Sequence, residues 1–125
     1  QVHLVDYKST SQKSAGKRIT LDDWWKASYK RQMDFYIWVM NRLGIETSDT
    51  GYFLYCDGDR FTDEPFLKDR SATMEFKITL IAYESDLSWI EPTLEKIKAL
   101  LDSPICPDHS KHCEHGAFLK ACLYD

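Results

Sequence analysis

The sequence has no apolar run close to the roughly 18 residues that a membrane-spanning helix requires. Its N-terminus also lacks the basic stretch followed by an apolar stretch that marks a secretory signal. We therefore expect a cytoplasmic protein that does not contact a membrane. With 125 residues, of which 43% are hydrophobic and 29% charged, the chain is long enough for one globular domain and too short for two.

Cysteine is scarce, and its spacing is irregular. The four cysteines are Cys56, Cys106, Cys113 and Cys122. Small secreted domains that depend on disulfides carry a denser and more regular set, so this class is excluded and the thiols are expected to be reduced.

An excess of positive charge is also missing, because 16 basic side chains stand against 20 acidic ones, which gives a net charge of -4. Overall charge alone would therefore not hold the protein to a nucleic acid. The charge is unevenly distributed, however: residues 1–31 carry +4 and the remaining residues carry -8. DNA could meet this basic end of the chain, and the candidate contact residues are Lys13, Lys17, Arg18, Lys30 and Arg31.

Hydrophobic periodicity predicts the order strand, helix, strand, strand, helix and tail. Strands are expected over residues 2–8, 50–56 and 72–84, where apolar and β-branched residues run together or alternate. Helices are expected over about residues 22–43 and 90–102. This order predicts an α/β fold in which helices flank a mixed sheet.

The first expected helix has the clearest start and stop signals and the clearest helical spacing of large side chains. Thr20 or Asp22 can cap its start, and Gly44 is a stop signal after Arg42. Large side chains recur at helical spacing, which indicates that the helix faces a core. These side chains are Trp25, Tyr29, Gln32, Met33, Tyr36, Val39, Met40 and Leu43.

Asp6 and Lys8 lie two residues apart in the first expected strand, so their side chains project from the same face. The Asp6 carboxylate and the main-chain carbonyl of Tyr7 would offer two oxygen ligands to a hard cation such as Mg²⁺. Lys8 could then orient a metal-bound water and stabilise the charge that develops on a phosphodiester. An ordinary ion pair at the end of a strand is the alternative interpretation.

Gln32 and Tyr36 are one turn apart and share a face of the first helix. A glutamine on so apolar a helix needs a hydrogen-bond partner, and a polar site on the neighbouring strand would supply one. The alternative is a structural glutamine at the edge of the core, with Tyr36 as ordinary packing.

Together these motifs resemble the PD-(D/E)XK nucleases, and in particular their RecB-like branch, which has an Asp-Tyr-Lys strand followed by a Gln-x-x-x-Tyr helix. The matching segments are Val5-Asp6-Tyr7-Lys8-Ser9-Thr10, Tyr29-Lys30-Arg31-Gln32-Met33-Asp34-Phe35-Tyr36, Leu43-Gly44 and Gly51-Tyr52-Phe53-Leu54-Tyr55. The resemblance implies a restriction-endonuclease-like core and cleavage of DNA or RNA phosphodiesters that depends on Mg²⁺ or Mn²⁺. By position, Asp6 would bind the metal and Lys8 would be the catalytic lysine, whereas Gln32 and Tyr36 would support the site and the DNA strand. The partners so implied are DNA and a helicase or another subunit of a nuclease complex.

The sequence departs from this family at its start. Family members place a further acidic ligand in a Gly-x-x-Asp strand ahead of the Asp-Tyr-Lys strand, whereas no acidic residue precedes Asp6 here. We expect the chain to be the C-terminal half of a longer nuclease, truncated at its N-terminus. Two alternatives stay open: a catalytically inactive module of the same fold that binds DNA or a protein, and a small zinc-binding interaction domain.

The C-terminal segment concentrates side chains that bind metals. We therefore distinguish a Cys/His-rich tail over residues 105–125 from a nuclease-like core over residues 1–104. Thiolates and imidazoles together favour zinc, and some RecB-like nucleases end in a cysteine cluster that holds an iron–sulfur centre or a zinc ion. Histidines on an exposed loop are the alternative. The candidate ligands are Cys106, His109, His112, Cys113, His115 and Cys122.

Overall fold

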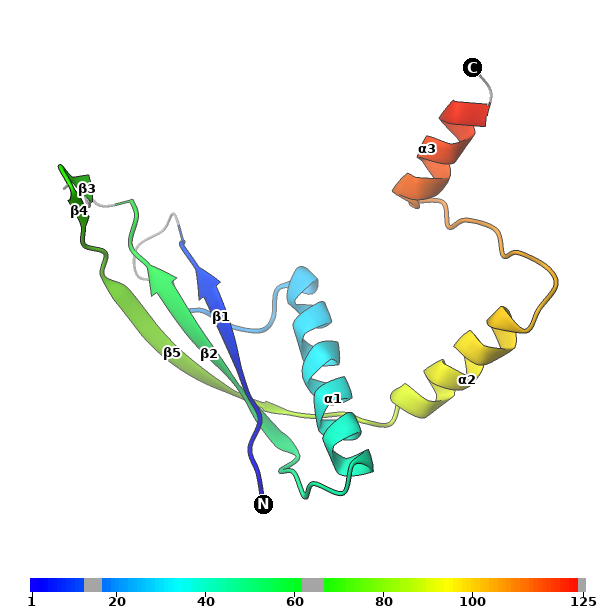
Figure 1. The fold of residues 1–125 in the computed structure, drawn as a ribbon, viewed down its shortest axis with the longest axis horizontal. Helices are drawn as coiled ribbons and strands as arrows, with labels where there is room; N and C mark the ends of the chain where they lie inside the picture. Colours follow the sequence, from blue (N-terminus) through cyan, green and yellow to red (C-terminus); the bar gives the residue numbers. More distant parts are fainter. Residues whose placement is uncertain (13–16, 62–66, 124–125) are drawn as a thin grey trace. The chain divides into compact units, whose positions relative to one another are not determined.

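A computed structural model of the chain describes residues 1–12, 17–61 and 67–123. It contains two compact units, Gln1–Leu87 and Ser88–Asp125. The elements of the first unit, drawn in Figure 1, are β1 (Val5–Thr10), α1 (Ala27–Arg42), β2 (Thr50–Gly58), β3 (Leu67–Lys68), β4 (Ser71–Ala72) and β5 (Phe76–Glu84). Those of the second are α2 (Ile90–Leu101) and α3 (Glu114–Leu123). None of the helices in the described ranges is both long and apolar enough to cross a bilayer.

The sheet that organises the first unit has three strands in the order β1-β2-β5. β1 and β2 are parallel and are joined through α1, whereas β2 and β5 are antiparallel. In this register Asp6 lies opposite Phe53, and Lys8 lies opposite Tyr55. The predicted α/β class with a mixed sheet is therefore confirmed. β3 and β4 pair with each other, and β4 includes Ala72, at which the third predicted strand begins.

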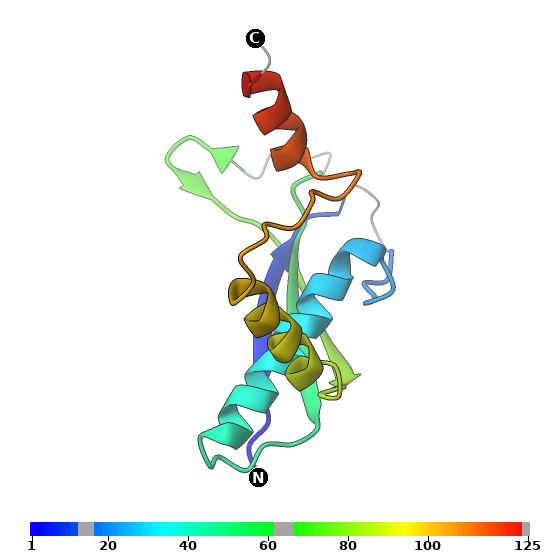
Figure 2. The same ribbon diagram turned by 90° about the vertical axis from the view of Figure 1, so that its right-hand side faces the viewer.

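α1 covers one face of this sheet (Figures 1 and 2). Met33 and Ile37 of α1 pack with Phe53 and Tyr55 of β2, and all four side chains are almost inaccessible to solvent. The predicted helical stripe was partly wrong. Ile37, which the stripe omitted, is fully buried, whereas Leu43 is 70% exposed because it lies beyond the last helical residue.

Two residues that precede α1 complete the core, namely Ile19 and Leu21. The helix itself begins later than predicted, at Ala27, after a short 3₁₀ turn over Trp24–Lys26. The predicted cap by Thr20 or Asp22 is wrong, since no side chain caps the first turn.

The predicted end of the helix at Gly44 is confirmed. Gly44 has a φ of +79°, in the left-handed region that favours glycine. Its N–H donates to the Asn41 carbonyl, and the N–H of Ile45 donates to the Met40 carbonyl, each at 3.0 Å. These two bonds form a Schellman motif, which satisfies carbonyls that have no partner inside the helix.

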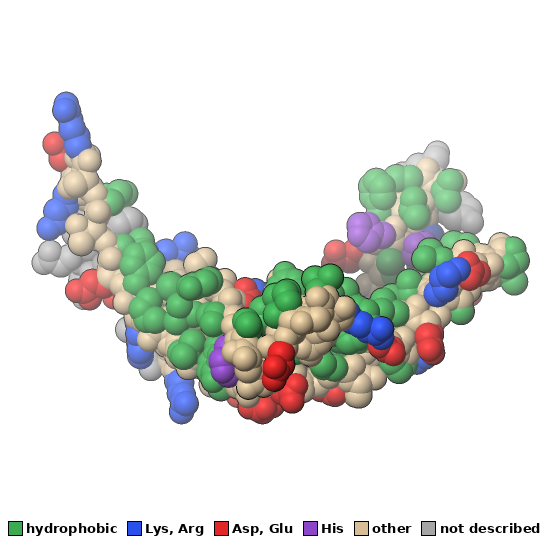
Figure 3. All heavy atoms as spheres, turned by 60° about the horizontal axis from the view of Figure 1, so that its bottom comes forward, with side chains coloured by type: hydrophobic (Ala, Val, Ile, Leu, Met, Phe, Trp, Pro, Cys, Tyr) green, Lys and Arg blue, Asp and Glu red, His purple; other side chains and the backbone are tan. Residues whose placement is uncertain are grey.

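The sheet face opposite α1 is apolar and solvent-exposed. The alternation of β5 places Thr79, Ile81 and Tyr83 toward α1, and it places Phe76, Ile78 and Leu80 on the other face, where they are 57–58% exposed. Figure 3 shows hydrophobic side chains gathered over this region of the strands. The alternation over residues 72–84 predicted a strand here, but not that its more apolar side would be the exposed one.

A buried carboxylate ties α1 to the end of β5. Asp34 is only 3% exposed, and it accepts a hydrogen bond from the main-chain N–H of Asp86 at 3.1 Å. Burial in the first place, and then the side-chain hydrogen bond with Asp34, raise the pKa of Tyr83 above its ordinary value. Tyr83 therefore keeps its proton well into the alkaline range.

We expect Tyr83→Phe to lower the free energy of unfolding by about 1 kcal/mol at pH 7, because the hydrogen bond to Asp34 is lost. Above about pH 10 an unfolded tyrosine ionises, whereas folded Tyr83 does not, so the wild type loses stability there as the pH rises. The free energy of unfolding of Tyr83→Phe should fall less over this pH range, so the difference in stability between the variant and the wild type should become smaller. Urea unfolding at pH 7 and pH 10.5 measures this, and an equal alkaline loss in both proteins would contradict it.

The second unit confirms the predicted helix near residues 90–102, which is α2. It also contains a helix that was not predicted, α3, in the part of the chain expected to be a tail. The boundary between the two compact units in the sequence lies between Leu87 and Ser88. The expected boundary at residue 104 is a distinction of composition and stays a prediction.

Candidate active site

Asp6 and Lys8 share a face of β1, as the strand alternation predicts, and the contact of Lys8 with Gln32 shows that this face is turned toward α1. Their side chains are 19% and 16% exposed, and Lys8 Nζ is 2.7 Å from Asp6 Oδ2. Between them Tyr7 points to the opposite face and is 72% exposed. The strand therefore holds a carboxylate and an ammonium side by side in a mostly buried position.

α1 brings Gln32 and Tyr36 to this pair. Lys8 Nζ donates to Gln32 Oε1 at 3.0 Å, and Gln32 Nε2 donates to the Tyr36 hydroxyl at 2.7 Å. The four predicted residues therefore form one continuous polar chain, Asp6–Lys8–Gln32–Tyr36. Its Tyr36 end is 44% exposed, so the chain leads from the sheet to the solvent.

Tyr29 and Tyr55 complete the surroundings of Lys8, although neither was among the predicted site residues. Lys8 Nζ lies 4.2 Å from the centroid of the Tyr29 ring, a cation–π contact, and Tyr55 is its register partner on β2. Two signals could have found them. Tyr29 precedes Gln32 by three residues on the same helical face, and Tyr55 follows the buried Phe53 by two residues on the same strand face.

The oxygen atoms near Asp6 fit part of a magnesium site. Asp6 Oδ2 is buried and accepts no hydrogen bond within the described residues, although the Lys8 ammonium lies beside it. Among the residues that the structure describes, β1 pairs with β2 alone in this sheet, and the Leu4 carbonyl accepts from Tyr52 N–H on that side. Because the main-chain groups of successive strand residues point to opposite sides, the Tyr7 carbonyl points to the free edge.

These two oxygens would leave most positions around Mg²⁺ to water and to substrate phosphate, which is how this ion is commonly bound. In the described ranges no three His, Cys, Asp or Glu side chains are grouped closely enough to hold a metal by themselves. Binding of Mg²⁺ or Mn²⁺ therefore stays a prediction. Of its two candidate ligands, Asp6 supplies a carboxylate and Tyr7 a main-chain carbonyl.

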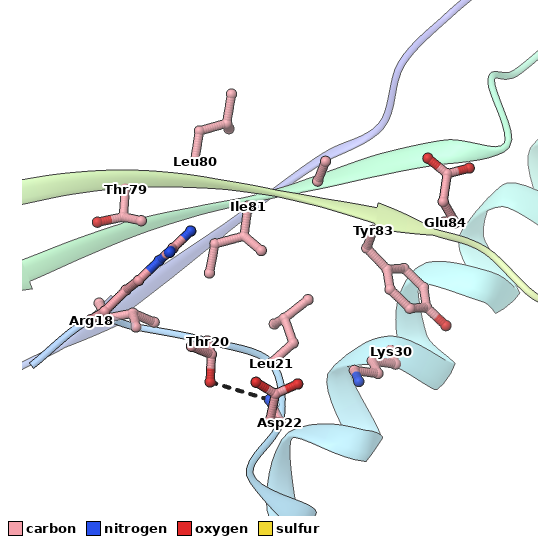
Figure 4. A pocket seen from close by; sticks show the side chains of 12 residues that line it. Arg18, Thr20, Leu21, Asp22, Lys30, Thr79, Leu80, Ile81, Tyr83 and Glu84 are labelled. Carbon is pink, nitrogen blue, oxygen red and sulfur yellow. Dashed lines mark hydrogen bonds between the residues drawn. The ribbon is translucent and has the colours of Figure 1, made fainter.

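The predicted DNA-contact residues fall in different places. Arg18 and Lys30 line a pocket of about 750 Å³ beside β5, together with Asp22 and Glu84 (Figure 4). Lys17 lines a smaller pocket that it shares with Lys8. Arg31 is exposed on α1, and Lys13 lies outside the described residues. Arg18 and Lys30 thus share one cavity, and Lys17 is the predicted contact that shares a cavity with the polar chain.

In the second unit, two of the six candidate zinc or iron–sulfur ligands contact each other. His109 Nδ1 lies 3.4 Å from Cys113 Sγ, which also accepts a hydrogen bond from Gly116 N–H at 3.3 Å. Cys106 and Cys122 are exposed free thiols. His112 and His115 are exposed as well. Zinc or iron–sulfur binding here also stays a prediction.

Comparison of the chain with family models, with curated proteins and with solved structures gives no match. The resemblance to PD-(D/E)XK nucleases therefore depends on the two motifs and on the geometry of the residues that carry them.

Proposed function

We propose that the chain is a metal-dependent DNA nuclease of the PD-(D/E)XK type, which hydrolyses phosphodiester bonds at Asp6 and Lys8. One observation carries this proposal: the strand motif and the helix motif, 24 residues apart from Lys8 to Gln32, meet in a single hydrogen-bonded chain. A strand-end ion pair would not need a helix to position its lysine.

Each residue has a role that its contacts support. Asp6 and the Tyr7 carbonyl would hold Mg²⁺, which when bound lowers the pKa of a coordinated water and polarises the phosphate. Lys8 stabilises the charge that develops on the phosphate oxygens. Gln32 positions Lys8 through its amide oxygen, and Tyr36 fixes the orientation of that amide through the hydrogen bond from Nε2.

The presence of a single candidate carboxylate favours a second possibility, a module of the same fold that binds DNA without cleaving it. In that case Lys8 would remain paired with Asp6, and an added divalent cation would not change the protein. Metal dependence therefore separates the two functions.

We expect Mn²⁺ or Mg²⁺ to support cleavage of end-labelled DNA, EDTA to stop it, and Asp6→Asn to slow it about a hundredfold, since the amide lacks the charge that holds the cation. Asp49→Asn is the matched control, because Asp49 is an exposed carboxylate just before β2. Gel analysis of single-turnover reactions gives the rates.

Cleavage at the wild-type rate by Asp6→Asn would contradict the proposal. Absence of cleavage in the wild type with either cation, combined with retained DNA binding, would favour the non-catalytic module instead.

A further inference from the structure

A pocket of about 290 Å³ lies where β1 ends, beside the segment that leads into α1. It opens at the carboxyl end of a strand that is parallel to its neighbour, the position at which α/β folds commonly bind ligands. Its volume is at the lower end for small-ligand sites, so it admits one compact group rather than a double helix. Lys8 lines it, which connects it to the polar chain described above.

Lysines outnumber carboxylates in the lining of this pocket, which favours an anion. Three lysines line it, Lys8, Lys17 and Lys26, against one carboxylate, Asp23. Lys8 is paired with Asp6, which is not in the lining, so Lys17 and Lys26 are the lysines that would meet the ligand. Lys26 is only 6% exposed; its Nζ donates to the Thr20 carbonyl at 2.7 Å and lies 2.8 Å from Asp23 Oδ2. These contacts hold a buried cation in a fixed place at the wall of the pocket.

Tyr55 provides a hydrogen-bond donor without a partner. The residue is 3% exposed and lines the pocket, and its hydroxyl has no hydrogen-bond partner within the described part of the chain. Burial above all raises the pKa of Tyr55, so the hydroxyl keeps its proton. A buried hydroxyl in this condition costs stability unless a ligand accepts its proton.

An aromatic surface borders the same pocket. Trp25 lines it and is 48% exposed, with its ring edge-on to Tyr29 at 5.8 Å between centroids. The neighbouring Trp24 is 88% exposed but does not contribute to the lining. An exposed indole next to lysines is the combination that stacks the unpaired bases of single strands.

We propose that this pocket binds one nucleotide of single-stranded DNA, with the base stacked on Trp25 and the phosphate held by Lys17, Lys26 and the Tyr55 hydroxyl. The inference rests on the proposed function, because it specifies the form of DNA that reaches Lys8. Binding to the pocket does not itself require a metal, so it can be measured apart from cleavage.

The test measures fluorescence anisotropy of a fluorescein-labelled decamer of thymidylate in EDTA, with Trp25→Leu, Tyr55→Phe and the control Trp24→Leu. We expect Trp25→Leu to weaken binding about tenfold, as the loss of one stacked base does, and Trp24→Leu to bind as the wild type does. Tyr55→Phe should weaken binding severalfold without lowering the thermal unfolding temperature, because it removes a hydroxyl that is unsatisfied in the free protein. A merely structural tyrosine would not show this combination.

Competition with small ligands shows whether the pocket recognises the base, the phosphate or both together. Thymidine 5′-monophosphate should displace the decamer at lower concentrations than either thymidine or inorganic phosphate. Wild-type affinity in Trp25→Leu or in Tyr55→Phe would overturn the inference, and so would equal competition by inorganic phosphate and the nucleotide. If binding follows the expected pattern but no divalent cation supports cleavage, the pocket assignment stands and the nuclease proposal fails.

Discussion

Phe53→Ala is expected to lower the free energy of unfolding of the Gln1–Leu87 unit by about 3–5 kcal/mol, the cost of truncating a buried phenylalanine. Phe53 is completely buried in the middle of β2, and its ring centroid lies 6.1 Å from that of Tyr83. It belongs to the same core cluster as Met33 and Ile37 of α1. A unit of this size has a total stability of the same order, so the loss would unfold a large fraction of the molecules.

Tyr7→Ala is the matched control for this change, because it truncates an aromatic side chain on the opposite, exposed face of the same sheet. We expect it to change stability by no more than about 0.5 kcal/mol. Urea unfolding followed by circular dichroism compares the two variants. If the two variants lower the free energy of unfolding by the same amount, α1 and β2 do not form the core of the unit.

The sequence predicted which candidate residues share a face, because this depends on local geometry. Side chains two apart on a strand share a face, and side chains four apart on a helix share a face, so the pairs Asp6–Lys8 and Gln32–Tyr36 follow directly from spacing. Their meeting could be expected from the need of Gln32 for a hydrogen-bond partner and from the family resemblance. The structure adds the contact itself, between Lys8 and Gln32.

The features of the fold that the sequence did not predict are mostly those that depend on tertiary contacts. Ile19 and Leu21 are core residues in a segment whose composition is polar, and their burial follows from packing against α1 and β2 rather than from a local pattern. Alternation in β5 could not decide which face α1 covers. In the C-terminal segment the density of Cys and His favours a metal site, and this composition conceals a run of helix-forming residues from Glu114 to Leu123 that produces α3.

Lys8→Met is expected to reduce cleavage about a thousandfold, because the charge that stabilises the reacting phosphate is removed. The same change should lower the free energy of unfolding by about 2 kcal/mol, since the mostly buried Asp6 carboxylate loses the ammonium 2.7 Å away. Gln32 would also lose the donor to its amide oxygen.

The double variant Asp6→Asn, Lys8→Met separates the two effects. An amide in place of the carboxylate removes the unpaired buried charge, so the double variant should regain most of the lost stability, with a coupling energy of about 1–2 kcal/mol in the double-mutant cycle. Cleavage should stay at least as slow as in Lys8→Met, because neither the metal ligand nor the cation is restored. Recovery of stability without activity would mean that this ion pair is kept for its chemistry, whereas additive effects of the two substitutions on stability would show that Asp6 and Lys8 do not act as a pair.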